Sequence, residues 1–241
     1  MLRVHSIESL GTYDGPGIRL VIFLQGCNFK CLYCANPDTI AYQGGSEYLL
    51  EDLVKMADRQ RPFFGKKGGI TISGGEPLIQ AKELTNLFIR LKQEGFNTCI
   101  DTNGSILNTS SKALLEYTDL VLLDIKHIDN SKHKKLTGMN NQRTLAFADY
   151  LAEINQPVWL RYVLVPGYSD KPDDLHALGQ RISGMQNIEK LEIQPYHKLG
   201  VHKYEALGCN YELSDVVPNT PEQLNRAKKI LESYVNEVVV N

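Results

Sequence analysis

The stretch R-L-V-I-F-L-Q-G-C-N-F-K-C-L-Y-C, residues 19–34, decides the fold. Its first part is a short apolar run, which is typical of a buried strand, and its second part holds three cysteines spaced C-x3-C-x2-C. Similar apolar runs recur along the chain, and segments with apolar residues every three or four positions separate them. The alternation indicates βα units that build a parallel sheet. Strands are predicted at residues 19–25, 69–73, 97–100, 120–123, 158–165 and 188–194.

Six such units predict either a doubly wound sheet or an incomplete (β/α)6 barrel, because a closed barrel of this kind needs about eight units. We expect one domain, residues 1–241, since α/β barrels of this length commonly form a single core.

The formal net charge of -2 offers no basic surface for nucleic acid. No apolar run is long enough to span a bilayer, and the first residues lack a secretory signal, so we expect a cytoplasmic chain with reduced thiols.

Polar or glycine-rich clusters follow the predicted strands at their carboxyl ends. In a parallel barrel these ends share one face, where active sites are built. The clusters therefore predict one active-site cavity, although six unrelated turns would use the same residue types. Besides the cysteine loop, they are S-G-G-E-P (residues 73–77), D-T-N-G (101–104), D-I-K-H (124–127), P-G-Y-S-D (166–170) and Q-P-Y-H (194–197).

The three cysteines Cys27, Cys31 and Cys34 favour an iron-sulfur cluster, because soft thiolates are its usual ligands. No fourth cysteine follows nearby, so one iron of a 4Fe-4S cluster would stay open for a reactive ligand. A structural Cys3His zinc site is the alternative, but no histidine lies in or just after the loop. Cys99, in a predicted strand, and Cys209, in a later loop, are interpreted as packing or incidental thiols.

With its C-x3-C-x2-C loop after the first predicted strand, the chain resembles the radical S-adenosylmethionine (SAM) superfamily. The segment G-T-Y-D-G-P-G-I-R, residues 11–19, is similar to the signature of enzymes that activate glycyl radical enzymes. The resemblance covers nearly the whole chain, from H-S-I-E-S near the start to P-Y-H-K-L-G-V-H-K-Y near the end. Larger members carry extra cysteines in an insertion, whereas residues 35–73 hold none, so the short form that acts on pyruvate formate-lyase fits best.

This resemblance implies a partial barrel that cleaves SAM reductively at the cluster and makes a backbone glycyl radical on pyruvate formate-lyase. It implies a flavodoxin or ferredoxin-like reductant, and we expect a monomer. Three other functions stay open. One is the activation of another glycyl radical enzyme. A second is radical chemistry on a small molecule, which the signature at residues 11–19 disfavours. The third is electron transfer, for which four cysteine ligands would be usual.

The resemblance also implies roles for the remaining clusters. Gly74, Gly75 and Glu76 would approach the methionyl group of SAM, although a turn that opens the helix near Ala81 would look the same. Asp101, Thr102 and Asp124 would hold Na+ or K+; a salt-bridge network with Lys126 and Arg161 is the alternative. The further cofactor-binding residues that it implies are Asp124, Ile125, Lys126, Arg161 and, at the adenosine end, His197, which could instead cap its strand.

One position departs from the expected family pattern. The resembled form has C-H-N at the last cluster cysteine, where this chain has Cys34-Ala35-Asn36. The Ala35 side chain cannot bind the cofactor, so a contact there would come from the backbone or from Tyr33. After His197, an amphipathic helix is predicted at residues 220–235, and no segment remains for a lid.

Overall fold

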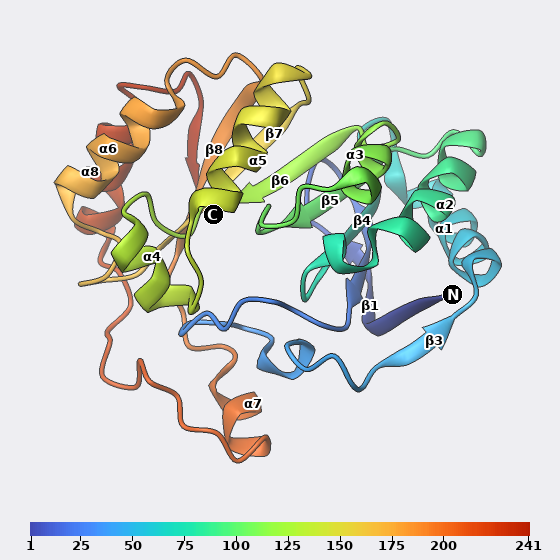
Figure 1. Cartoon of the computed structure of the whole chain (residues 1–241), viewed down its shortest axis with the longest axis horizontal. Coiled ribbons are helices and arrows are strands. Elements are labelled where there is room, and N and C mark those ends of the chain that lie inside the picture. The colour runs from blue at the N-terminus through green and yellow to red at the C-terminus, as the bar shows by residue number, and fades with distance from the viewer. The chain divides into compact units, whose positions relative to one another are not determined.

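The computed structural model describes all 241 residues, and these divide into two compact units. The N-terminal unit comprises residues 1–28 and 39–122, and the C-terminal unit comprises residues 29–38 and 123–241. The boundary passes through the cysteine loop, so Cys27 belongs to the first unit, whereas Cys31 and Cys34 belong to the second. Figure 1 shows the elements of each unit.

The N-terminal unit is built on a sheet in the order β3-β1-β2-β4-β5. β1 runs antiparallel to both β2 and β3, whereas β2, β4 and β5 are parallel. The core strand β2 is buried at five of its six positions, which fits its continuous apolar run. The strands of this unit are β1 (Leu2–Gly11), β2 (Arg19–Leu24), β3 (Ser46–Tyr48), β4 (Gly69–Gly74), β5 (Thr98–Thr102) and the first residues of β6 (Leu120–Asp124).

Three helices accompany this sheet: α1 (Leu50–Phe64), α2 (Ala81–Gln93) and α3 (Thr109–Leu115). The short 3-10 helix η2 (Pro77–Gln80) leads directly into α2. The apolar face of α2 packs inward, because Leu84, Leu87, Phe88 and Leu91 recur every three or four positions and are all buried.

Arg19, at the start of β2, is completely buried within the N-terminal unit. Its guanidinium donates to the Thr71 hydroxyl, to the carbonyl oxygen of Ile70 at 2.8 Å and to the side-chain oxygen of Asn97 at 2.9 Å. It also donates to the carbonyl oxygen of Pro16 at 3.1 Å. A buried guanidinium is tolerated only when its donors are paired, and here they tie the start of β2 to β4 and to Asn97, just before β5.

In the C-terminal unit, β7 (Val158–Leu164), β8 (Ile188–Pro195) and β9 (Val238–Val240) form consecutive parallel pairs. α6 (Pro172–Ile182) and α8 (Pro221–Leu231) lie side by side (Figure 1). Thr220 caps α8 with a reciprocal capping box to Gln223, so the helix begins where a T-x-x-Q pattern predicts. The other elements are η1 (Pro37–Thr39), at the junction of the two units, and α4 (Asn130–Thr137), α5 (Gln142–Glu153) and α7 (Val201–Ala206).

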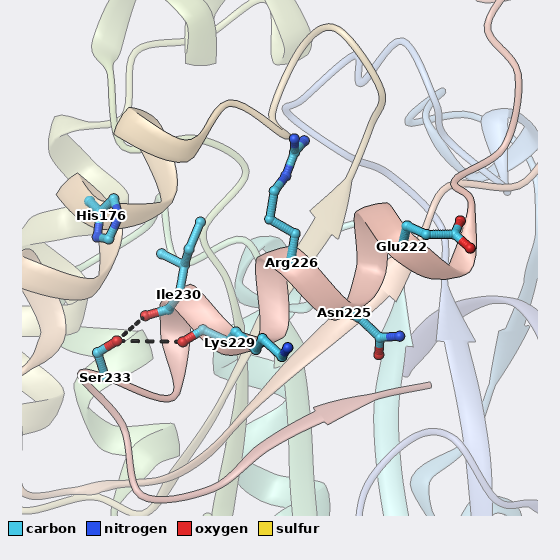
Figure 2. A pocket seen from close by; sticks show the side chains of 7 residues that line it. All are labelled: His176, Glu222, Asn225, Arg226, Lys229, Ile230 and Ser233. Atoms are coloured by element: carbon cyan, nitrogen blue, oxygen red, sulfur yellow. Dashed lines mark hydrogen bonds between the residues drawn. The ribbon is translucent and has the colours of Figure 1, made fainter.

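A groove of about 580 Å³ follows α8 on the outside of this unit. Figure 2 shows that its lining comes mainly from one side of α8, with one residue from α6. Both charge signs are present, and no cysteine or candidate cofactor residue contributes to it. The lining residues are His176, Glu222, Asn225, Arg226, Lys229, Ile230 and Ser233.

The six predicted strands correspond to β2, β4, β5, β6, β7 and β8, with ends that differ by at most two residues. The helix predicted at residues 220–235 is shorter, because α8 ends at Leu231. Strands β1, β3 and β9 and helix α7 were not predicted. None of the helices has the length and apolar character that crossing a bilayer requires.

Candidate active site

The cysteine loop has neither helix nor strand from Gln25 to Asn36. Its backbone is nevertheless held in place. In the N-terminal unit the Cys27 amide donates to the carbonyl oxygen of Ile40 at 3.1 Å. In the C-terminal unit the amides of Lys30 and Leu32 donate to the carbonyl oxygens of Thr137 and Leu136, each at 2.9 Å. The end of α4 therefore fixes the centre of the loop.

The thiols of this loop fit the ligands of an iron-sulfur cluster. Cys27, Cys31 and Cys34 form no disulfide and are partly exposed, whereas Cys99 is buried in β5 and Cys209 is exposed beyond α7. Burial raises the pKa of the Cys34 thiol, and a hydrogen bond from the Asn36 backbone and the charges of Lys126 and Lys203 oppose that shift. Burial removes the water that would otherwise stabilise the thiolate, and these groups would stabilise the metal-bound thiolate instead.

Gly74 and Gly75 lie against the end of β2, immediately before the first cysteine. The Gly75 amide donates to the carbonyl oxygen of Leu24 at 2.9 Å, and the Glu76 amide donates to that of Gly26 at 2.8 Å. A Cβ atom on Gly75 would lie 2.1 Å from the Gly26 carbonyl oxygen. Gly74 has φ = 103°, in the region that favours glycine, and a Cβ there would lie 2.4 Å from the Leu24 amide nitrogen. Larger residues would displace the cysteine loop.

The Glu76 carboxylate is buried and accepts three hydrogen bonds within the N-terminal unit. The donors are the Leu78 amide at 2.9 Å, the Thr102 hydroxyl at 2.6 Å and the Asn103 amide at 2.8 Å. Burial raises the pKa of Glu76 to about 7, although these hydrogen bonds oppose the shift. Glu76 thus caps η2 and joins the ends of β4 and β5, a role that its place in S-G-G-E-P did not reveal.

Two of the predicted cation ligands lie at the end of β5. Thr102 uses its hydroxyl to donate to Glu76, and the same oxygen accepts from the Gly104 amide at 3.0 Å. Asp101 accepts from the Ser73 hydroxyl at 2.8 Å, so β4 and β5 are joined here as well.

The third, Asp124, forms an ion pair in the C-terminal unit with Lys126, at 2.7 Å. Both side chains are more than four-fifths buried. Burial disfavours the charge on Lys126, but the carboxylate of Asp124 and the neighbouring Tyr33 and Cys31 outweigh it and raise the Lys126 pKa. The second carboxylate oxygen of Asp124 and the Tyr33 hydroxyl are buried without hydrogen-bond partners. Such atoms usually have a partner, so these two could receive a polar ligand.

Ile125, between these two residues, is buried, and its amide donates to the Arg161 carbonyl oxygen at 3.2 Å. The buried Arg161 guanidinium contacts the Glu192 carboxylate at 3.0 Å, and Lys190 reaches the same carboxylate at 2.8 Å. His197 is exposed after β8, and the Leu199 amide donates to its ring nitrogen at 3.4 Å.

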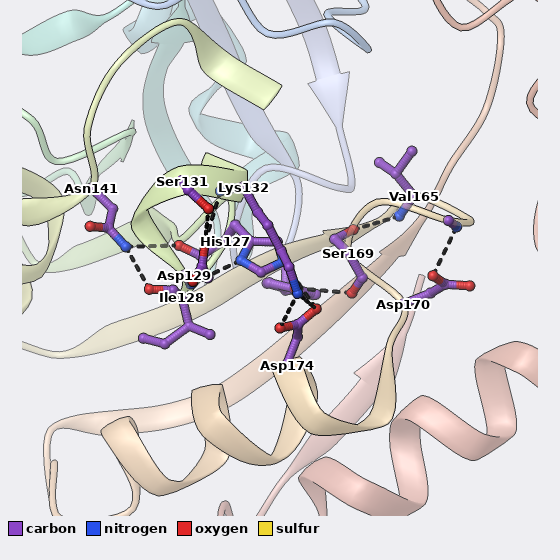
Figure 3. A network of polar contacts seen from close by, with 12 residues as sticks. His127, Ile128, Asp129, Ser131, Lys132, Asn141, Val165, Ser169, Asp170 and Asp174 are labelled. Carbon is purple, nitrogen blue, oxygen red and sulfur yellow. Dashed lines mark hydrogen bonds and ion pairs between the residues drawn. The ribbon is translucent and has the colours of Figure 1, made fainter. Parts of the chain in front are cut away.

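The last residue of D-I-K-H, His127, is completely buried in a polar network that the sequence did not predict (Figure 3). The Asp129 amide donates to His127 Nδ1 at 2.9 Å, so the ring proton lies on Nε2, 3.4 Å from the Asp174 carboxylate. Burial lowers the pKa of His127, which keeps the ring neutral. Lys132 contacts Asp174 at 2.7 Å and links α4 to α6. This network fixes the backbone just after Lys126.

Known proteins match the chain in sequence and in fold. The family model described as Radical SAM superfamily matches residues 21–178. Pyruvate formate-lyase 1-activating enzyme of Escherichia coli strain K12 is 48% identical over 240 residues, which are 98% of each chain. Pyruvate formate-lyase-activating enzyme of Staphylococcus aureus strain USA300 is 48% identical over 242 residues, covering 97% of this chain and 95% of the relative. The structure of Streptococcus suis SuiB bound to precursor peptide SuiA has a TM-score of 0.70 at 18% identity, covering 92% of this chain and 48% of that one.

The fold and the cysteine loop thus define a radical SAM protein, and the chain belongs to the radical SAM superfamily. This confirms the predicted α/β class with a parallel sheet, and the likeness in fold is consistent with an incomplete barrel. Within the superfamily, the chain belongs to the family of the pyruvate formate-lyase activating enzymes, which are enzymes that use a 4Fe-4S cluster and SAM.

Proposed function

We propose that the chain activates pyruvate formate-lyase by generating a glycyl radical on its backbone. The observation that carries this proposal is the 48% identity to activating enzymes along nearly the entire chain, with the C-x3-C-x2-C loop intact. When bound, the cluster and SAM together supply a 5'-deoxyadenosyl radical that can take a hydrogen atom from a partner glycine. The protein must bind, orient and shield these groups.

Cys27, Cys31 and Cys34 are assigned to the cluster, whose open iron would accept SAM. Partial exposure and the absence of disulfides support this assignment. Gly74 and Gly75 let the backbone after β4 lie directly against the residues before Cys27, so this turn is assigned to the methionyl group of SAM. Glu76 is assigned to the same site and acts through its buried hydrogen bonds, which hold the turn in place.

The D-I-K-H residues Asp124, Ile125 and Lys126 are assigned to SAM as well. Two observations support this assignment: a lysine that stays charged although it is buried, and a carboxylate oxygen of Asp124 that is left for a further partner. Arg161 and His197 are assigned to the carboxylate or ribose and to the adenosine, respectively. With Ala35 in place of histidine, Tyr33 and the backbone remain to contact the cofactor.

Asp101, Thr102 and Asp124 are proposed to hold Na+ or K+, since hard oxygen ligands suit such ions. The ion pair between Asp124 and Lys126 favours the alternative, a salt bridge in place of the ion. The two interpretations can be separated, because only a bound cation makes activity depend on the cation in the buffer.

We further propose that residues 1–241 act as one radical SAM domain and as a monomer. The family match at residues 21–178 includes residues of both units, which supports a single functional domain. A flavodoxin or ferredoxin-like protein would supply the electron. The cytosol is the proposed compartment, because none of the five cysteines forms a disulfide and thiols stay reduced there.

The test combines anaerobically reconstituted protein with SAM, a reductant and pyruvate formate-lyase, and records the glycyl radical by electron paramagnetic resonance. Wild type and Cys209→Ala should both produce the signal, since Cys209 is an exposed thiol outside the loop. Cys31→Ala should produce none. Full activity of Cys31→Ala would contradict the cluster assignment. A wild-type chain that cleaves SAM without forming the glycyl radical would contradict the assignment of pyruvate formate-lyase as the substrate.

A further inference from the structure

Helix α7 and the glycine before it pack onto the chain just after Cys34, all within the C-terminal unit. Gly200 lies so close to Ala35 that a Cβ atom there would be 2.7 Å from the Ala35 carbonyl oxygen and 2.8 Å from its Cα. Only a residue without a side chain allows this approach. Gly200 and the start of α7 thus pack directly against the residues that follow Cys34, although the two segments are far apart in sequence.

Lys203, in α7, links the helix to the residues after Cys34 through its ammonium group. Nζ donates to the Asn36 side-chain oxygen at 2.7 Å and lies 3.0 Å from the Asp38 carboxylate. The side chains of Lys203 and Asp38 are about three-quarters and two-thirds buried, at 26% and 30% exposure, so water screens the pair only in part. The Asp38 charge adds to the rise in the pKa of the Cys34 thiol, and the Lys203 charge opposes it.

Tyr204, the next residue in α7, lies beside the same cysteine. Its ring packs edge-on against Tyr211 at 5.0 Å between centroids. Burial raises the Tyr204 pKa, the charges of Cys34 and Cys31 add to the rise, and a hydrogen bond from the Cys34 backbone opposes it. α7 therefore presents an uncharged phenol and a fixed cation to the segment that carries the last cluster ligand.

We propose that Lys203 is a positioning residue for the cluster: it holds residues 34–38 in one conformation and compensates the negative charge of Asp38 near Cys34. The proposal rests on the assignment of Cys34 to a 4Fe-4S cluster. An iron-sulfur cluster gains negative charge on reduction, so a nearby cation favours the reduced state. Lys203 should therefore raise the reduction potential of the cluster. A higher potential makes it easier for the flavodoxin or ferredoxin-like reductant to reduce the cluster.

The test compares Lys203→Met with Lys203→Arg, which keeps the charge, and with Lys198→Met. Lys198 is an exposed lysine of the same segment that donates to the Ser214 carbonyl oxygen, so it serves as a matched control. Hydrogen exchange of residues 34–38 is measured without the cluster, and the midpoint potential is measured on the reconstituted protein. We expect exchange about tenfold faster in Lys203→Met. We also expect a more negative potential at unchanged iron content, whereas the other two variants stay near wild type.

Wild-type exchange and wild-type potential in Lys203→Met would overturn the proposal, and so would an equal shift in Lys198→Met. A wild-type chain that binds no iron would instead contradict the cluster assignment. The exchange measurement would then still decide whether Lys203 orders residues 34–38. The two failures are therefore distinguishable.

Discussion

Glu76 is a buried acid on which several hydrogen bonds of the N-terminal unit converge. Its carboxylate is buried, accepts three hydrogen bonds and has a pKa raised to about 7. For an acid whose pKa is higher in the folded than in the unfolded state, the folded state binds more protons between the two values. Stability is then greatest below the unfolded pKa and is lost as pH rises through the folded pKa.

Glu76→Gln should remove this pH dependence, because the amide does not ionise. Between pH 5 and pH 8, we expect wild type to lose about 2–3 kcal/mol of unfolding free energy relative to the variant. Urea unfolding of both proteins at the two pH values measures the difference. Parallel pH profiles would show that Glu76 does not titrate in this range.

Asp124 has one carboxylate oxygen paired with Lys126 and one without a hydrogen-bond partner. If the carboxylate oxygen that has no partner binds a monovalent cation, activity should require Na+ or K+ and should fall sharply in Asp124→Asn. The measurement is 5'-deoxyadenosine formation in sodium, potassium and tetramethylammonium buffers. Equal rates in all three buffers would favour the internal ion pair with Lys126 over the bound cation.

Helices α4 and α6 are joined by the buried carboxylate of Asp174. Asp174 contacts Lys132 from α4 and lies next to the His127 ring, and its own side chain is mostly buried. Removing one partner of such a network leaves the remaining charge poorly compensated.

Asp174→Asn should therefore lower the free energy of unfolding by about 2 kcal/mol. Asp173→Asn is the matched control, because Asp173 occupies the same first turn of α6 but is exposed, and its effect should stay within about 0.5 kcal/mol. Denaturant unfolding compares the three proteins. Equal losses in the two variants would attribute the effect to the helix dipole, which both aspartates share.

The elements also show how far the sequence could predict the structure. All six core strands were predicted, because continuous apolar runs survive in parallel strands that are buried on both faces. β1 was missed because most of its side chains are exposed or only half-buried, and its pairing with β2 is irregular. α7 was missed because it has six residues and none is buried.

The candidate site divides in the same way. The cysteines were predicted from residue type and spacing, which determine metal ligation, and the glycine pair was predicted from the family resemblance. The hydrogen bonds of Glu76, the burial of His127 and the contacts of Lys203 with Asn36 were not. These depend on which distant segments meet, and a single sequence carries no direct record of that.

For the molecule as a whole, the open question is what closes the site around the radical. Because such a radical must be kept from water, we expect the partner's glycine loop itself to shield it once bound. A short peptide that copies this loop should accelerate 5'-deoxyadenosine formation, and the same peptide with alanine in place of the central glycine should be a poorer donor. The yield is measured chromatographically with each peptide and without one. Three equal yields would favour a small-molecule substrate.

The buried Arg19 changes what the G-T-Y-D-G-P-G-I-R segment can be used for. Its arginine donates to oxygens of Ile70 and Asn97 on two other segments of its own unit and to the Pro16 carbonyl oxygen within the stretch, and Gly15 makes room for it, since a Cβ there would lie 3.0 Å from Arg19 Cδ. At least part of this diagnostic stretch therefore records a folding requirement. A protein engineer who wishes to redirect such an enzyme to a new partner should leave Arg19 and Gly15 alone and vary the exposed positions around them, such as Tyr13.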